Sequence, residues 1–174
     1  VSNAGEGSSG FNVRGGAEDQ NLVLLDEAII YNASHLFGFF SVFNTDAIKD
    51  IKLYKGGIPS RFGGRASSVL DIRQKDGNSK RFSGSGGIGV ISSRLAIERP
   101  TFNDKGSFLL AGRSSYANIF LALANNQNRA GFYDLNLKTN YQLDDKNRLY
   151  LSGYFGDDNF ELSNFFTNSY GNLS

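Results

Sequence analysis

The chain has 174 residues, with 18 basic and 17 acidic side chains and a formal net charge of +1. A net charge so close to zero excludes the strong field that gathers nucleic acid or anionic lipid, and the absence of cysteine excludes disulfides, thiolate catalysis and cysteine-ligated metals. No run approaches 18 apolar residues, so no transmembrane helix is predicted. Transmembrane β-strands stay compatible with the sequence, because they are apolar only at every second residue.

Short strands separated by glycine turns are predicted for residues 1–76. The first is Phe11–Arg14, which ends at a glycine pair. The apolar run Leu22–Tyr31 is interrupted only by Asp26 and Glu27, so we expect two short strands joined by a tight turn at these two residues. A helix is the alternative for this run, since Leu, Glu and Ala favour helices.

The chain after residue 44 predicts a helical turn followed by two strands. Thr45 has the properties of an N-cap and Asp46 suits a first helical turn, so one or two turns of helix are expected over Thr45–Lys49. Alternating apolar and polar residues then predict strands at Ile51–Lys55 and Val69–Arg73.

Alternation is the only clear pattern in residues 77–174. A glycine-rich strand is expected at Ser83–Val90, and a hairpin at Ser93–Arg99 and Ser107–Ser115. A second hairpin begins at Phe132–Leu143 and has a polar turn at 144–147. In its first strand one face carries Leu135, Leu137, Thr139, Tyr141 and Leu143, and the other face carries Asp134, Asn136, Lys138, Asn140 and Gln142.

These hairpins have the arm length of membrane strands. Arms of roughly nine to twelve residues are long enough to cross a bilayer at a tilt. Short turns alternate with one long connection, which contains the apolar segment Tyr116–Leu123, expected to be a loop, a short helix or the end of a strand. A soluble antiparallel sandwich is the alternative, because its strands also alternate. About five strands cannot close a large barrel, and Val1 is neither an initiator Met nor followed by a leader, so we expect a piece of a longer protein.

Several short motifs together resemble a known family. They are FNVRGG at 11–16, LLDE at 24–27, AIKDIKLYKGG at 47–57, RFGGR at 61–65 and SVLDI at 68–72. In order and spacing they resemble the plug of TonB-dependent outer-membrane receptors, most of all those of Bacteroidetes. Glu27 departs from the pattern, because the family usually has glycine after Leu-Asp.

The resemblance implies a mixed α+β plug followed by an all-β transmembrane antiparallel barrel. Residues 1–76 would be the C-terminal part of the plug, and residues 77–174 the first strands of a barrel of about 22 strands. The implied function is uptake of a scarce nutrient (an iron chelate, cobalamin, a glycan or a peptide) across the bacterial outer membrane, without catalysis and without a cofactor. The implied partners are TonB, through a segment upstream of Val1, outer-membrane lipid and possible surface lipoproteins.

The resemblance also implies roles for individual residues. Residues 32–44 would form an apical plug loop, so His35, Phe37, Phe39 and Phe40 would contact substrate. The alternative is that the phenylalanines pack the plug core and His35 is merely exposed. Arg14 and Lys55 match positions where the family carries cations that pair with the barrel wall; the alternative is that both are solvated strand-end charges.

Other candidate sites have weak signals. The glycine-rich run at 84–89 resembles a phosphate-binding loop but precedes no predicted helix. A single His does not suit a zinc site, and Asp144-Asp145 and Asp157-Asp158 match no calcium loop. Two other functions stay open: a non-transport outer-membrane barrel that acts as a surface-binding or assembly partner of lipoproteins or secretion machinery, and a soluble β-sandwich enzyme or lectin.

Overall fold

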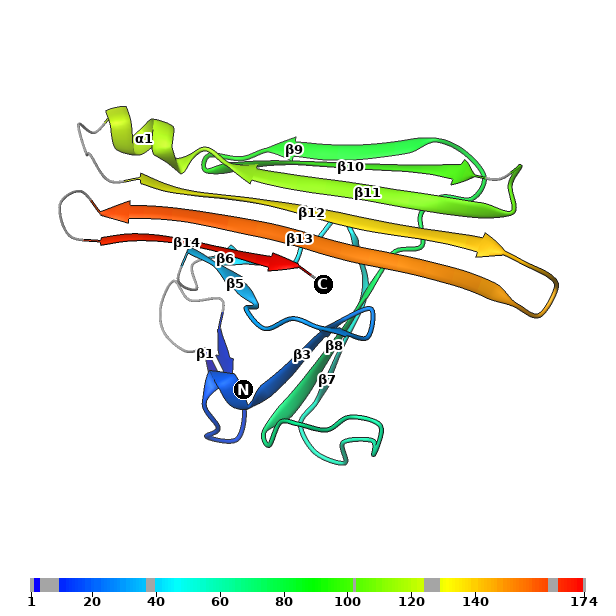
Figure 1. Ribbon diagram of the computed structural model, residues 1–174, viewed down its shortest axis with the longest axis horizontal. Helices are drawn as coiled ribbons and strands as arrows, with labels where there is room; N and C mark the ends of the chain where they lie inside the picture. Colours follow the sequence, from blue (N-terminus) through cyan, green and yellow to red (C-terminus); the bar gives the residue numbers. More distant parts are fainter. Residues whose placement is uncertain are drawn as a thin grey trace. The chain divides into compact units, whose positions relative to one another are not determined.

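The computed structural model (Figure 1) describes residues 2–3, 10–36, 40–101, 103–123, 129–162 and 166–173. The chain divides into two compact units. The first consists of Val1–Phe43, Ile48–Gln74 and Ser174, and the second of Asn44–Ala47 and Lys75–Leu173. The short segment Asn44–Ala47 thus belongs to the second unit, although its sequence neighbours on both sides belong to the first.

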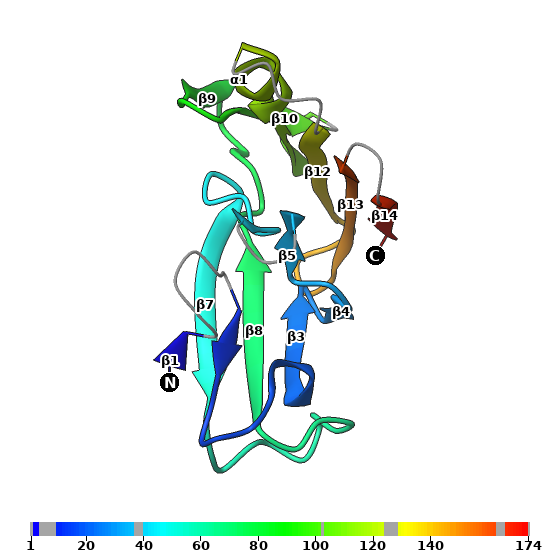
Figure 2. The ribbon, with the colours of Figure 1, turned by 90° about the vertical axis from the view of Figure 1, so that its left-hand side faces the viewer.

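The first unit is built on a mixed four-stranded sheet in the order β4-β3-β8-β7. Its parallel centre is the pair β3 and β8, which lie side by side with β7 in Figure 2. The pairs β3–β4 and β7–β8 are antiparallel. The bounds are β3 Asn21–Leu25, β4 Ala28–Ile29, β7 Ile48–Tyr54 and β8 Ser68–Gln74; a 3₁₀ helix spans Glu18–Gln20, and two small pairs join β1 Ser2–Asn3 to β2 Phe11–Asn12 and β5 Ser34–His35 to β6 Phe40–Ser41.

The predicted turn at Asp26 and Glu27 is confirmed. Both residues have positive φ, at 48° and 75°, so they form the two central positions of a hairpin turn whose twist matches the flanking strands. The Asp26 side chain then accepts the backbone N–H of Gln74 at 3.1 Å, which ties the turn to β8. The helix considered for this run is therefore excluded.

The core of the first unit lies along the parallel strand pair. All five residues of β3 are buried, and Val69 and Ile72 of β8 are buried beside them. Leu22, Leu24 and Val69 form one apolar cluster, and Tyr54 and Phe62 pack against it with ring centroids 5.5 Å apart. Burial on both faces explains why this run is continuously apolar instead of alternating.

The predicted helix at Thr45–Lys49 is wrong. The structure has a single turn at residues 45–47, and β7 begins at Ile48. Asn44 forms the turn in place of Thr45: its Oδ1 accepts the N–H of Asp46 at 3.0 Å, and its carbonyl accepts the N–H of Ala47, also at 3.0 Å. Pairing of Ile48 with Gln74 then draws the chain into the sheet before a second helical turn can form.

The second unit is an antiparallel sheet in the order β14-β13-β12-β11-β10-β9, in which every strand pairs with its sequence neighbour (Figure 1). The sheet is open among the described residues, with β9 and β14 at its edges. The expected hairpins are confirmed, and one further strand, β14, pairs with β13. The bounds are β9 Ser83–Ile88, β10 Ser92–Thr101, β11 Gly106–Ser115, α1 Ala117–Leu123, β12 Arg129–Gln142, β13 Arg148–Leu162 and β14 Phe166–Leu173.

The apolar segment after β11 forms the helix α1, which was one of the three conformations expected for it. Asn118 of α1 accepts the backbone N–H of Ala130 at 2.6 Å and so holds the helix to the start of β12. Among the described residues, no helix has both the length and the apolar character needed to span a bilayer.

Candidate functional site

The six-stranded sheet buries its polar face and exposes its apolar face. In β12, Asp134 and Asn136 are each 2% exposed, whereas Leu135 between them is 45% exposed. The same inversion continues in β13, where Asp158 is 3% exposed and Phe155 on the opposite face is 39% exposed. We call these the polar face and the apolar face. A soluble sandwich has the reverse arrangement, whereas a membrane barrel turns apolar residues outward and polar residues to its lumen.

Charged side chains on the polar face form a row across three strands. In the register of the sheet, Arg94 of β10 lies opposite Arg113 of β11, and Arg113 lies opposite Asp134 of β12. Nη2 and Nε of Arg113 bind Oδ2 of Asp134 at 2.6 and 2.8 Å, with the Asp134 side chain fully buried. The Arg113 guanidinium also lies 5.1 Å from the ring centroid of Phe132.

The segment Asn44–Ala47 contacts this polar face directly. Oδ2 of Asp46 accepts a hydrogen bond from Nε of Arg94 at 2.7 Å. Ala47 is 1% exposed and packs in an apolar cluster with Ala96 of β10 and with Leu109 and Ala111 of β11. One acidic and one apolar contact thus hold a four-residue piece of chain to the sheet.

The chain contacts the same face again where it leaves β8. The N–H of Lys75 donates to the carbonyl of Ala47 at 2.8 Å, and its Nζ donates to the carbonyl of Asp46 at 2.7 Å. Asp76 follows, and its carboxylate lies 3.2 Å from Nζ of Lys138. The carbonyl of Asp76 accepts Oγ of Ser107 at 2.6 Å and Nδ2 of Asn140 at 2.9 Å. The residues before β7 and those after β8 are therefore both bound to the second sheet.

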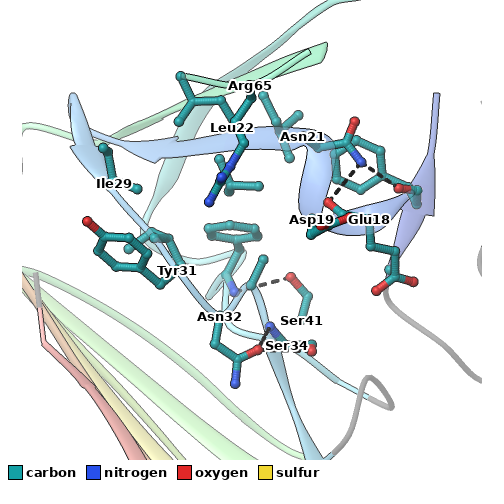
Figure 3. Close-up of a pocket in the computed structure, with 17 residues that line it drawn as sticks. Glu18, Asp19, Asn21, Leu22, Ile29, Tyr31, Asn32, Ser34, Ser41 and Arg65 are labelled. Atoms are coloured by element: carbon teal, nitrogen blue, oxygen red, sulfur yellow. Dashed lines mark hydrogen bonds between the residues drawn. The ribbon is translucent and has the colours of Figure 1, made fainter. Parts of the chain in front are cut away.

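The first unit contains a hollow of about 400 Å³ (Figure 3). Apolar residues of β3 and β4, including Leu22 and Ile29, form one wall, and the Arg65 guanidinium points into the space. Glu18 and Asp19 lie at the opposite end. Two polar side chains of the lining are engaged locally: Oδ1 of Asn32 accepts Oγ and N–H of Ser34, both at 3.3 Å, and Nδ2 of Asn21 donates to the carbonyl of Phe11 at 2.8 Å.

Of the four residues expected to contact substrate, two lie in short strands of the first unit and two lie outside the described residues. His35 is in β5, next in sequence to Ser34 of the hollow, and is 1% exposed. Phe40 begins β6 and pairs with His35 in the register. Phe37 and Phe39 lie outside the described residues.

The two cations expected to contact the barrel wall lie close together in the first unit. Arg14 is exposed and has a positive φ of 53°. Its guanidinium covers Gly56, where an added Cβ would come within 2.8 Å of Nη2. Lys55, next to Gly56, is also exposed. Glycine at 56 thus provides the space that the Arg14 side chain occupies.

The weaker candidate sites are parts of strands and turns. The glycine-rich run that resembled a phosphate loop lies in β9 except for its last glycine, and a Cβ at Gly86 would come within 2.9 Å of the Arg94 carbonyl. Asp144 closes the β12–β13 turn by accepting Nδ2 of Asn147 at 2.8 Å and the N–H groups of Lys146 and Asn147, each at 2.8 Å. The bond from the Asn147 side chain, together with these two backbone N–H groups, lowers the pKa of Asp144. No cluster of three or more His, Cys, Asp or Glu suited to a metal exists in the described part of the chain.

Sequence reasoning missed Asp46, Asp76 and Arg94 as a contact set. Their local patterns indicated a first-turn helix residue for Asp46 and one more polar residue of an alternating strand for Arg94. The Asp46–Arg94 contact spans 48 positions, and local pattern carries no information on a pairing of that separation. The one available signal was that Arg94 and Arg113 would need acidic partners if the hairpin register placed them opposite each other.

Residues 1–69 match the family model described as the TonB-dependent Receptor Plug Domain. No curated protein and no solved structure matches the chain significantly. The match covers the mixed sheet of the first unit up to Val69 in β8, and with it the motifs at 11–16, 24–27 and 47–57. The part of the chain that this match covers, residues 1–69, is therefore similar to a TonB-dependent receptor plug domain.

Proposed function

We propose that the chain is part of an outer-membrane TonB-dependent receptor that imports a scarce nutrient through a barrel gated by the plug. The observation that carries this proposal is the combination of a plug domain at residues 1–69 with a following sheet whose exposed face is apolar. Plug domains accompany TonB-dependent transport, and half-exposed leucines on every second position suit contact with lipid.

The size of the apolar face supports a membrane-spanning sheet. On β12 it extends from Tyr133, which is 48% exposed, to Leu143 just after the strand, which is 59% exposed. Ten residue steps of about 3.3 Å make roughly 33 Å along the strand. A tilt of about 40° reduces this to roughly 25 Å of height, which equals the apolar band of outer-membrane barrels. An aromatic residue at the end of the band suits the membrane interface.

In this proposal residues 1–76 belong to the plug and residues 77–174 to the first strands of a barrel of about 22 strands. TonB would act on a segment outside this chain. Phe37, Phe39 and Phe40 would contact cargo, and His35 would do so only after the residues that bury it move. Arg14 and Lys55 would face the barrel wall.

Growth under nutrient limitation tests the proposal. Deletion of the gene should abolish growth on one limiting iron chelate, cobalamin, glycan or peptide, and the loss should be equal in a strain without TonB. The wild-type gene should restore growth only where TonB is present. Unchanged growth of the deletion strain on every source would instead favour a non-transport barrel that binds or assembles lipoproteins or secretion machinery.

Membrane fractionation distinguishes the two outer-membrane hypotheses, a transporter and a non-transport barrel, from a soluble protein. The full-length protein should be recovered in the outer-membrane fraction, and its mobility on a gel should change on heating, because a closed barrel resists detergent until it is unfolded. Recovery as a soluble protein without detergent would overturn the proposal.

A further inference from the structure

Two arginines occupy directly opposite positions on the polar face. Arg94 and Arg113 are register partners in the β10–β11 pair, and like charges at opposite positions repel each other. Each arginine binds an acid: Arg113 binds Asp134, and Arg94 binds Asp46. The four residues form a row in which two acids flank two cations.

The two acids differ in how they are held. Asp134 belongs to β12, the neighbouring strand of the same sheet, and its side chain is fully buried. Asp46 belongs to the segment Asn44–Ala47, whose sequence neighbours lie in the first unit. Its side chain is 20% exposed. Asp134 therefore stays beside Arg113 as long as the sheet exists, whereas Asp46 can leave Arg94 if its segment moves.

Arg94 has N–H donors in addition to the Nε that binds Asp46. Its Nε binds Asp46, and its side chain is 50% exposed. The guanidinium lies against Gly87, where an added Cβ would be 3.4 Å from Nη2. Because glycine has no side chain, the Nη edge of Arg94 is accessible. A guanidinium presents five N–H donors in a planar fork, which suits bidentate contact with a carboxylate or phosphate.

We propose that Arg94, supported by Arg113, is a binding site for a carboxylate or phosphate group, and that Asp46 occupies this site in the present conformation. An anion that binds Arg94 displaces the Asp46 carboxylate and releases Asn44–Ala47 from the polar face. The inference rests on the proposed function only in that the polar face would then line the transport path and the anion would be carried by the cargo.

Replacement of Asp46 by an incoming anion is favoured because the Asp46–Arg94 contact is weak. The Asp46–Arg94 pair is partly exposed, at 20% and 50% of the two side chains, and such pairs contribute little to stability. Ala47 contributes only a methyl group to the apolar cluster, and the two Lys75 bonds join the segment to the chain after β8 and not to Arg94. Loss of Asp46 without replacement would leave the row of four with two arginines and one acid. An incoming anion restores the charge balance, so release of the segment and binding of the anion are coupled.

A cysteine at position 47 reports release of the segment. In the full-length protein in detergent, with no other cysteine, Ala47→Cys should react slowly with a maleimide, because Ala47 is buried. Inorganic phosphate, and separately citrate, should raise the rate roughly two- to fivefold over chloride at equal ionic strength, the factor that a half-exposed ion pair contributes. Phosphate tests a free anion, and citrate tests the clustered carboxylates of an organic cargo.

Arg94→Gln in the same background should raise the basal rate by a similar factor and remove the response to both anions. Arg99→Gln is the matched control, since Arg99 alternates with the polar-face residues of the same strand and should leave the response intact. A wild-type rate that does not change with phosphate or citrate, or a response that persists in Arg94→Gln, would overturn the proposal.

Modification of arginine in the protein without an introduced cysteine keeps the inference testable if Ala47→Cys does not fold. Phosphate should protect Arg94 from phenylglyoxal, and Asp46→Asn should strengthen that protection, because the competing carboxylate is gone. If phosphate does not change the extent of Arg94 modification in Asp46→Asn, the proposed anion site is contradicted. Neither readout depends on transport, so a failed uptake assay and a failed anion site are distinguished.

Discussion

Asp46 and Arg94 are joined by a 2.7 Å hydrogen bond between Oδ2 and Nε across 48 positions of sequence. Asp46 precedes β7 by two residues, and Arg94 lies in β10 of the second sheet. A second contact of this kind joins Asp76, two residues after β8, to Lys138 of β12. The residues that flank β7 and β8 in sequence are thus bound to cations of the polar face.

Asp134→Ala should destabilise the sheet strongly. The substitution removes the carboxylate that binds the Arg113 guanidinium, whose side chain is 14% exposed. Removing one partner of a buried ion pair costs about 3–5 kcal/mol. The free energy of unfolding, measured in urea from lipid vesicles, should fall by this amount. Asp145→Ala in the exposed turn is the control and should change it little; equal effects of the two variants would contradict the importance of the pair.

Leu137→Arg should test contact of the apolar face with lipid. Leu137 lies in the middle of the exposed run on β12 and is 40% exposed. At the centre of a bilayer an arginine costs about 2–4 kcal/mol, whereas near the interface it costs about 0–1 kcal/mol. Unfolding from vesicles should therefore show a large loss for Leu137→Arg and a small one for Leu143→Arg. In a soluble sheet, two exposed leucines should give equally small losses.

Glu27→Gly should stabilise the β3–β4 hairpin. Glu27 has a φ of 75°, a conformation that costs a residue with a side chain about 1 kcal/mol relative to glycine. Its contact with Arg73 is 3.5 Å between exposed groups and offsets only part of this cost. Hydrogen exchange of the Ile30 amide, which donates to Val23 at 2.9 Å, should slow several-fold. Glu27→Ala keeps the strained backbone and should not slow it.

Gly77→Ala should disturb the segment that leads from β8 into the second sheet. Gly77 has a φ of 83°, and an added Cβ would lie 2.5 Å from the carbonyl oxygen of Phe108 in β11. The backbone of β11 cannot move away without breaking its pairing, so the variant should lose more than about 1 kcal/mol of stability. Gly63→Ala has open space around it and a φ outside the strained range, and it should be tolerated. The stability of each variant would be measured as the temperature at which its gel mobility changes.

Asn147→Ala should raise the pKa of Asp144. The side chain of Asn147 is the largest cause that lowers this pKa, followed by the backbone N–H groups of Lys146 and Asn147. Since the folded pKa is depressed, the turn is stabilised above the ordinary carboxyl range, and the stabilisation is lost as the pH falls through the folded value. Carboxyl ¹³C NMR of Asp144 should show the titration moving to higher pH in the variant. An unchanged titration would contradict the proposed cause.

Local sequence patterns were sufficient for the strands of the two long hairpins and for the tight turn. Alternation along Phe132–Leu143 located β12, and the two acidic residues inside Leu22–Tyr31 located the hairpin turn at Asp26-Glu27. Both features arise within a few residues, because strand periodicity and turn geometry are local properties of the backbone. The prediction failed at Thr45–Lys49, where pairing of Ile48 with Gln74 overrides a weak helical tendency.

The sequence alone determined that β12 has one apolar and one polar face, since side chains alternate along any strand. It could not say which face is buried, because alternation is the same whether the apolar face meets a core or a lipid. Only the tertiary structure decided that Asp134 is buried and Leu135 exposed, and only it placed Asp46 against Arg94. Contacts between residues far apart in the chain depend on how whole strands assemble, and no local pattern encodes that assembly.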